Sequence, residues 1–164
     1  MGASALARLM CSYCGCDSIE VVGRFMAEHV EIINATGVLR RAIEAGDPPA
    51  VKDACTVLAA LLFPHTTSEE VGLFTVMRRE AELAVHVDAL CAEHHQLDEA
   101  LAAIAGGAYD GMPAFETLLR DHIHKEDNAL FPAAAIWLGG DEWTEVHQLT
   151  HDHDHALGTE HSHH

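Results

Sequence analysis

Two short segments of this 164-residue chain place a glutamate four residues after a histidine. One segment contains His65 and Glu69, and the other contains His122 and Glu126. In each, a second acid follows the glutamate directly, and the dipeptide Leu-Phe comes after two further residues. Residues four apart project from the same face of a helix, so each histidine and its glutamate could bind one metal ion together. The repetition gives the pattern more weight than either pair has alone.

Two further histidines fall on the apolar faces of predicted helices. His29 and His94 each occupy one position in a helical pattern of apolar residues, and each follows a glutamate, Glu28 or Glu93. A single histidine on such a face is more often a hydrogen-bonded core residue than a ligand. Four of them together with two inward glutamates favour a metal site, because unpaired carboxylates buried in a small core are costly unless cations compensate them.

Helix caps divide the first half of the chain. Asp17 or Ser18 is expected to cap the first helix, with Glu20 completing a capping box. Asp47 is expected to cap the second helix, and Pro48 suits its first turn, where the missing N–H is tolerated. The sequence therefore predicts a helical hairpin that carries His29 on its first arm.

Prolines and glycines mark the remaining helix boundaries. Pro64 predicts a kink in the second helix, just before the first histidine–glutamate pair. We expect the third helix to run from about Met77 to Gly106, and Pro113 to open a fourth helix that Pro132 breaks or kinks. Short connections between these helices favour antiparallel neighbours.

The predicted fold class is all-α, an antiparallel up-down four-helix bundle with a short C-terminal helical extension. Alanine and leucine are abundant, aromatic residues are only 5% of the chain, and the length suits one domain. Such a bundle would bring six side chains to one interior as candidate metal ligands: His29, His65, Glu69, His94, His122 and Glu126.

We expect three parts along the chain. Residues 1–16 form a cysteine-containing leader, residues 17–138 form the bundle, and residues 139–164 form a short helical extension and a histidine-rich tail. Residues 133–150, which span the boundary between the second and third parts, are expected to be helical and to cover one end of the bundle. The tail from His151 onward is low in apolar residues and is expected to be disordered.

The leader and the tail offer further possible metal ligands. Cys11, Cys14 and Cys16 supply three soft ligands for zinc or another divalent metal, or a redox site, one short of a four-sulfur site. The alternative is a leader of free thiols. The histidines of the tail could bind divalent metal weakly, and because other residues interrupt them they favour a natural tail over a purification tag.

The charge balance excludes some classes of partner. Nine basic residues face 26 acidic ones, giving a formal net charge of -17, so neither nucleic acid nor an anionic membrane surface is expected as a partner. No uncharged apolar stretch is long enough for a transmembrane helix, and the N-terminus is a poor match to a secretory signal. With five cysteines, an odd number, the chain is expected in a reducing, cytoplasmic location.

The ligand types restrict the metal. Imidazole with carboxylate suits iron, manganese or zinc. Six protein ligands are more than one tetrahedral zinc ion needs, whereas two ions bridged by Glu69 and Glu126 would use all six and leave open positions. Paired iron ions with open positions could bind dioxygen, nitric oxide or peroxide.

The combined motif resembles the bacterial hemerythrin-like, or HHE cation-binding, family over about residues 18 to 135. The resemblance rests on Glu28-His29, His65-x3-Glu69-Glu70-x2-Leu73-Phe74, Glu93-His94 and His122-x3-Glu126-Asp127-x2-Leu130-Phe131-Pro132. It implies an up-down four-helix bundle around a non-haem di-iron centre, with carboxylate and oxo or hydroxo bridges and a site for small diatomic ligands.

One departure from the oxygen-carrying hemerythrins bears on function. Those proteins have five histidine ligands, two of them a turn apart on the third helix, but here Leu90 and Asp98 lie one turn from His94. The four-histidine, two-glutamate set is similar to that of di-iron proteins tied to nitrosative stress, iron–sulfur repair and peroxide breakdown. Reversible oxygen carriage is therefore the less favoured function.

Three functions remain open at this point. The first is a di-iron protein that binds or reduces small oxidants, with an electron donor as partner and with turnover undecided. The further acids near its site are Glu70, Glu93 and Asp127, each of which could hydrogen-bond a ligand histidine. The second is a metal-handling protein that stores, senses or delivers iron, using the cysteines and the histidine tail and passing metal to an accepting protein. The third is an interaction module with an incidental metal. The sequence leaves the oligomeric state undetermined.

Overall fold

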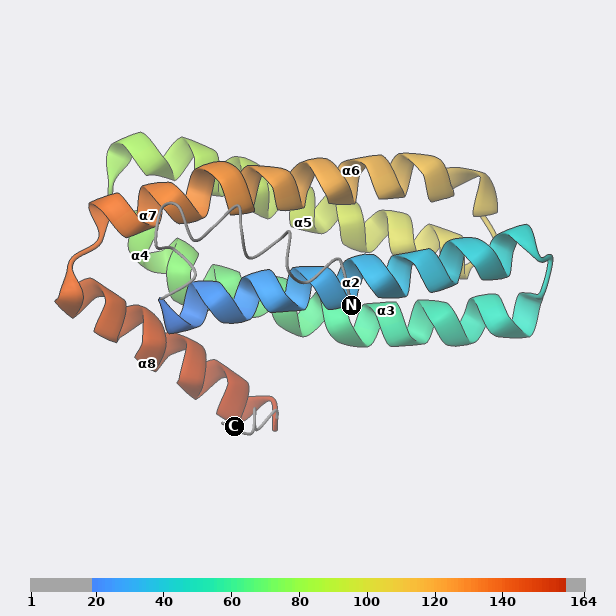
Figure 1. Ribbon diagram of the computed structural model, residues 1–164, viewed down its shortest axis with the longest axis horizontal. Coiled ribbons are helices and arrows are strands. Elements are labelled where there is room, and N and C mark those ends of the chain that lie inside the picture. The colour runs from blue at the N-terminus through green and yellow to red at the C-terminus, as the bar shows by residue number, and fades with distance from the viewer. Residues whose placement is uncertain (1–18, 159–164) are drawn as a thin grey trace, which may run out of the picture.

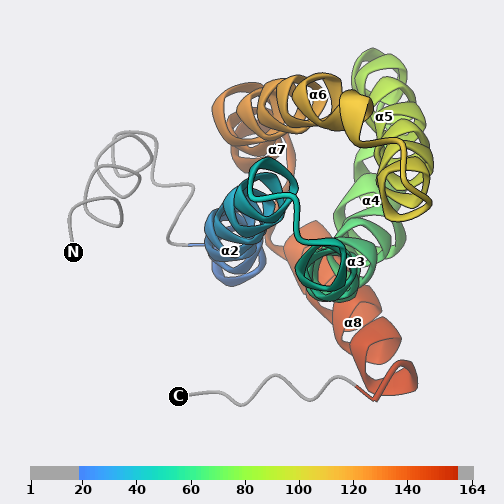
Figure 2. The same cartoon turned by 90° about the vertical axis from the view of Figure 1, so that its right-hand side faces the viewer.

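The computed structural model describes residues 19–158, which are helical apart from short connections and contain no strand. Four long helices lie side by side around a common axis (Figures 1 and 2): α2 (Glu20–Glu44), α3 (Pro48–Glu69), α5 (Ala81–Ala105) and α6 (Met112–Lys125). A further long helix, α8 (Gly140–Ala156), lies at an angle to them and packs against α3 and, above all, against the helical segment that follows α3. The all-helical prediction is confirmed.

The turn between α2 and α3 follows the predicted chemistry. Gly46 has φ +63°, a left-handed conformation that glycine adopts without strain. The Asp47 side chain then accepts a hydrogen bond from the Ala50 backbone N–H at 3.1 Å, and Pro48 occupies the first turn of α3. At the other end of the hairpin, α2 begins at Glu20, and the predicted cap residues 17 and 18 lie outside the described residues.

The second helical run is longer than predicted. α3 continues without a break through Pro64, because its buried face on both sides of the proline outweighs the cost of an interior proline, about 3 kcal/mol for the lost backbone bond and the ring clash together. A π-helical segment, η2 (Glu70–Phe74), and one more turn, α4 (Thr75–Met77), follow. Met77 therefore ends this run. The predicted start of the third helix at about Met77 was wrong, and α5 begins only at Ala81.

The fourth run contains the same irregularity. α6 passes into a π-helical segment, η4 (Glu126–Leu130), and then into α7 (Phe131–Trp137). We expected Pro132 to break or kink the fourth helix, but the run continues through it. It lies in the first turn of α7, after the wider π turn, where its missing N–H is tolerated. π turns are frequent at functional sites, and here each one adjoins a predicted ligand glutamate.

The tail is partly ordered, which corrects the prediction of disorder from His151 onward. α8 continues to Ala156, and Asp154 near its end is buried, with only 8% of its surface exposed. Polar contacts described below hold this end of α8 in place, which apolar patterning does not reveal. None of the helices in residues 19–158 combines the length and the hydropathy that a bilayer crossing demands.

Two apolar clusters fill the interior, one at each end of the four long helices. The first contains Phe25, Leu73, Leu90 and Leu130, and the second contains Ile32, Leu62, Leu97 and Leu119. All seven residues of the predicted α5 seam are buried: Leu83, Val87, Leu90, His94, Leu97, Leu101 and Ile104. On each of the four helical runs that begin with α2, α3, α5 and α6, a short stretch with buried polar side chains separates the residues of one cluster from those of the other.

Candidate metal centre

The polar stretches between the two clusters hold the six predicted ligands. None of the six side chains exceeds 3% relative exposure, and the two glutamates are fully buried: His29, His65, Glu69, His94, His122 and Glu126. α2 and α5 each contribute one histidine, while α3 contributes a histidine and a glutamate, as does α6 with the adjoining η4. The structure therefore brings together every residue that sequence analysis selected inside the bundle.

The six side chains form two overlapping groups, in each of which the ligand atoms all lie within 4.8 Å of one another. One group contains His29 and His65, and the other contains His94 and His122. Glu69 and Glu126 belong to both groups. This arrangement is able to hold metal ions, and the two shared carboxylates lie between the two histidine pairs.

Each shared carboxylate presents one oxygen to each histidine pair. Oε1 of Glu69 lies 3.1 Å from His65 Nε2, while its Oε2 lies 3.3 Å from His94 Nε2. Oε2 of Glu126 lies 3.0 Å from His29 Nε2, while its Oε1 lies 2.9 Å from His122 Nε2. Each carboxylate therefore faces both histidine pairs.

A ring of acidic residues orients the four histidines from outside. On one side of the bundle, Glu28 of α2 accepts from His65 Nδ1 of α3 at 2.7 Å. Glu70, at the start of η2, accepts from His94 Nδ1 of α5, also at 2.7 Å. Each acid thus contacts the histidine of the next helix along the chain.

The ring closes on the other side. Glu93 of α5 accepts from His122 Nδ1 of α6 at 2.8 Å, and Asp127 of η4 accepts from His29 Nδ1 of α2 at 2.8 Å. All four acids stand next to a candidate ligand in the sequence, and neighbours on a helix point about 100° apart, toward the adjacent helix. Such partners fix the tautomer and orientation of a metal-binding histidine.

The ring also sets the chemistry of the interior. Because ionised carboxylates only accept hydrogen bonds, each Nδ1 carries the proton, and a neutral ring then turns the lone pair of Nε2 inward. The four inward nitrogens meet the four oxygens of Glu69 and Glu126, so acceptors face acceptors. None of these buried oxygens receives a hydrogen bond, and neither does His29 Nε2. Positive charge between them would satisfy all these atoms, so the donor set fits metal cations.

The pKa values of His29 and His94 respond to the same demand for positive charge. Burial lowers the pKa of His29, but the hydrogen bond to Asp127 and the adjacent carboxylates of Glu126 and Glu69 raise it well above its ordinary value. Burial likewise opposes the shift at His94, where the carboxylates of Glu126, Glu69 and Glu70 raise the pKa to about 12. A bound cation would supply the charge that protons supply in the metal-free chain.

The two glutamates show the complementary effect. Burial by itself raises the pKa of Glu69, and the surrounding imidazoles, His65 first, lower it well below its ordinary value. The pKa of Glu126 is also lowered, against its burial and against the negative charge of Glu69, because His122 and His29 contact it. Both carboxylates are therefore ionised and available as ligands.

Comparison with known families gives an independent result. Residues 20–134 match the model of the family described as the hemerythrin HHE cation binding domain. The chain belongs to that family. The hemerythrin HHE match covers both π segments and the helices from α2 to the first part of α7, and it ends before α8. No curated protein and no solved structure matches the chain.

The positions that distinguish this chain from five-histidine hemerythrins do not join the site. Leu90 is buried in the apolar cluster beside the site, and Asp98 is half-buried elsewhere. Neither belongs to the two ligand groups found in the described residues. His95 and His124, each close in sequence to a candidate ligand, are exposed, as their helical positions predict.

Sequence analysis gave Glu28 only as part of a motif and missed its contact with His65. It named Glu70, Glu93 and Asp127 as possible partners of ligand histidines, and the structure confirms these contacts. The position of Glu28, directly before a candidate ligand like Glu93, is the signal that could have identified it.

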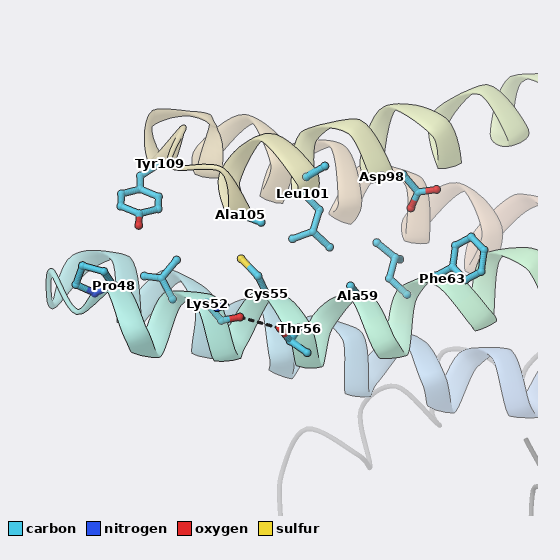
Figure 3. A pocket seen from close by; sticks show the side chains of 13 residues that line it. Pro48, Lys52, Cys55, Thr56, Ala59, Phe63, Asp98, Leu101, Ala105 and Tyr109 are labelled. Atoms are coloured by element: carbon cyan, nitrogen blue, oxygen red, sulfur yellow. Dashed lines mark hydrogen bonds between the residues drawn. The ribbon is translucent and has the colours of Figure 1, made fainter.

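The cysteines stand apart from the site. Cys11, Cys14 and Cys16 lie outside the described residues, so their predicted metal or redox role stays a prediction. Cys55 is buried and Cys91 half-buried, as expected for packing residues. Cys55 also lines a groove of about 710 Å³ between α3 and α5, drawn in Figure 3, that contains none of the six candidate ligands.

Proposed function

We propose that this protein holds two iron ions in the interior of an antiparallel up-and-down four-helix bundle, and that it binds or reduces a small oxidant there. One observation carries the proposal: Glu69 and Glu126 belong to two ligand groups at once, with no hydrogen bond to any of their oxygens. A single ion would leave one histidine pair without a partner. Two ions would occupy both groups and share both carboxylates.

The chain's own residues give the proposed site its properties. Each ion would have two histidine nitrogens and two shared carboxylates, fewer than the six ligands common for iron, which leaves room for an exogenous ligand. Phe131 stacks on His29 at 5.9 Å between ring centroids, and Phe74 stacks on His94 at 5.7 Å. These rings and the two apolar clusters limit the access of water, which strengthens electrostatic interactions inside.

Iron bound there would supply one-electron chemistry and an open position for dioxygen, nitric oxide or peroxide. The protein would supply fixed ligand positions, since the acid ring holds each imidazole from outside. Buried carboxylates would balance the positive charge of the ions. A role in oxidative or nitrosative stress, in the cytoplasm and with an electron donor as partner, belongs to this proposal.

Iron handling is the alternative that the sequence offered. It depends on the cysteine leader and the histidine tail, and residues 1–18 and 159–164 lie outside the described part of the chain. Within that part, the histidines of α8 belong to an ordered helix. We therefore favour the bundle interior as the functional centre. The kinetic test below decides between reduction of oxidants and the delivery or storage of iron.

Iron content tests the proposal. Protein produced in iron-sufficient medium should contain two irons per chain, and the Glu69→Ala, Glu126→Ala double variant should lose both. A Glu99→Ala variant is the control, because Glu99 is exposed and lies outside both ligand groups. A double variant that retains two irons, or a wild-type protein that binds none, would contradict the proposal.

Stopped-flow mixing separates turnover from storage. The reduced, iron-loaded protein is mixed with peroxide or nitric oxide, and the metal-free protein serves as the blank. Repeated oxidation and reduction of the same protein would support reduction of oxidants. Iron release with each oxidation would favour the handling role.

A further inference from the structure

The helix α8 lies outside the family match yet reaches the outer side of the metal centre. Its residue Asp154 is buried between α2 and α3 and forms an ion pair with the guanidinium of Arg24. The second carboxylate oxygen of Asp154 accepts from the Ser68 hydroxyl at 2.9 Å. Ser68 is fully buried and directly precedes Glu69, so both partners of Asp154 belong to the matched domain and adjoin its site.

Arg24 continues the connection inward. Its Nε donates to Glu28 Oε1 at 2.9 Å, and Glu28 Oε2 accepts from His65 Nδ1 at 2.7 Å. Four side chains thus form an unbroken sequence of charge-assisted hydrogen bonds from α8 to a candidate ligand, in the order Asp154, Arg24, Glu28, His65. Such bonds are stronger and more directional than neutral ones, so they transmit position.

Within residues 19–158, no comparable chain of charge-assisted hydrogen bonds joins α8 to the other histidine pair. Its matching acid, Glu93, also contacts a cation, but that cation is Lys125 of α6, which is 54% exposed. Glu28 therefore depends on a partner held by α8, whereas Glu93 depends on a partner within the family domain. The two proposed metal positions differ in what supports them.

A second contact fixes α8 against the segment that follows Glu69. A Cβ atom on Gly72 would lie 2.1 Å from Thr150 Oγ1, so the backbone of η2 and the side chains of α8 approach closely only because residue 72 is glycine. His153 of α8 also contacts the Thr67 hydroxyl at 3.1 Å. The docked position of α8 is thus well defined beside the ligand-bearing turns.

We propose that Asp154 is a positioning residue for the metal centre, acting through Arg24 and Glu28 on His65. Docked α8 then acts, through Arg24 and Glu28, on the affinity of the position between His29 and His65 rather than on that of the other position. Coupling of this kind is reciprocal, so metal bound at that position also tightens the docking of α8. The inference rests on the proposed function, because it requires two metal positions.

Anaerobic calorimetric titration of ferrous ion into metal-free protein tests the inference. The events belonging to the interior are those lost in the Glu69→Ala, Glu126→Ala variant. Asp154→Asn should weaken one interior event about 10-fold, the lower end of the range for partners behind a ligand. Lys125→Gln should weaken the other event. Asp152→Asn removes a charge from the same helix at an exposed residue and should change neither, which makes it the matched control.

The outcomes separate the two proposals. Two interior events in the wild type that Asp154→Asn leaves unchanged, or weakens equally, would overturn the inference and leave the proposed function standing. Interior events absent from the wild type would remove the proposed function itself. An effect of Asp154→Asn and Lys125→Gln on the same event would also overturn the inference.

If the Asp154→Asn variant fails to fold, a measurement on the wild-type protein still tests the inference. Amide hydrogen exchange of residues 140–156 should slow when ferrous ion is added to the wild type, and it should not slow in the Glu69→Ala, Glu126→Ala variant. Unchanged exchange in α8 of an iron-loaded wild type would overturn the inference.

Discussion

At the scale of single residues, the site depends on pairs in which one neighbour faces inward and the next faces sideways. Glu69 faces the interior, and Glu70 bonds to His94 of the following helix. Glu126 and Asp127 repeat the arrangement, with Asp127 bonded to His29. Each pair thus supplies one ligand and one orienting group within two residues. This division of roles explains why two acidic residues are adjacent in both repeated segments.

Removal of one orienting acid tests this division of roles. Glu70→Ala should lower metal affinity about 10–100-fold at the position that contains His94, because the imidazole loses the bond that fixes its orientation. The measurement is a competitive titration against a chelator of known affinity. Glu70→Gln, whose amide oxygen can still accept from Nδ1, should lose less. Equal affinity in Glu70→Ala and wild type would show that the ring does not orient the ligands.

At the scale of elements, the two π segments let one face of a helix serve two purposes. Up to the start of each π segment the buried positions carry ligands, and from Leu73 and Leu130 onward they carry apolar residues of the cluster beside α7 and α8. Across η2, the Thr75 hydroxyl donates to the backbone carbonyl of Glu70 at 2.8 Å. η2 is also the surface on which α8 packs.

The close approach of η2 and α8 gives a stability prediction. Gly72→Ala should destabilise the protein by about 1–3 kcal/mol, because the new methyl group collides with Thr150 Oγ1. Adding Thr150→Ala removes the colliding atom and should recover most of the loss, as measured by urea unfolding. Gly140→Ala is the control, since nothing lies within 4 Å of a Cβ there. A Gly72→Ala variant as stable as wild type would show that α8 is not packed as described.

Sequence patterns predicted the helices better than the junctions between them. The α5 seam was predicted in full, because a helical period over seven buried positions has few alternatives. The π turns were missed, since a wider turn shifts the period by one residue and resembles an interruption at Pro132. The order in α8 beyond residue 150 was also missed, because Asp154 is buried by Arg24, 130 positions away in the sequence.

The candidate site shows the same limit. Its six inward residues were found because ligand types recurred at helical spacing. The partner of each outward acid depends on which helix lies alongside, which spacing within one helix does not specify. Glu28 was therefore missed as the partner of His65, although its neighbour His29 was selected.

At the scale of the whole molecule, the interior is a polar layer enclosed between two apolar clusters. Each helix passes through this layer, so the layer joins all four at mid-length. Cations bound there would link ligands from all four helices as well as form a reactive centre. The stability of the fold and its metal content should therefore change together.

Metal removal tests this link. Ions present at about 1,000 times their dissociation constant stabilise a fold by about 4 kcal/mol. For a chain of this size, each kcal/mol changes Tm by about 2–4 °C, so a chelator should lower Tm by about 8–16 °C. Differential scanning calorimetry with and without chelator gives the shift, and the Glu69→Ala, Glu126→Ala variant should show none. An equal shift in that variant would place the stabilising metal elsewhere.

The positions of the metal ions test the account most directly. Anomalous diffraction at the iron absorption edge from crystals of the iron-loaded protein should show two peaks about 3.5–4 Å apart, as in other two-metal sites. One peak should contact His29 and His65, the other His94 and His122, and both should contact Glu69 and Glu126. A single peak, or peaks away from these side chains, would contradict the account.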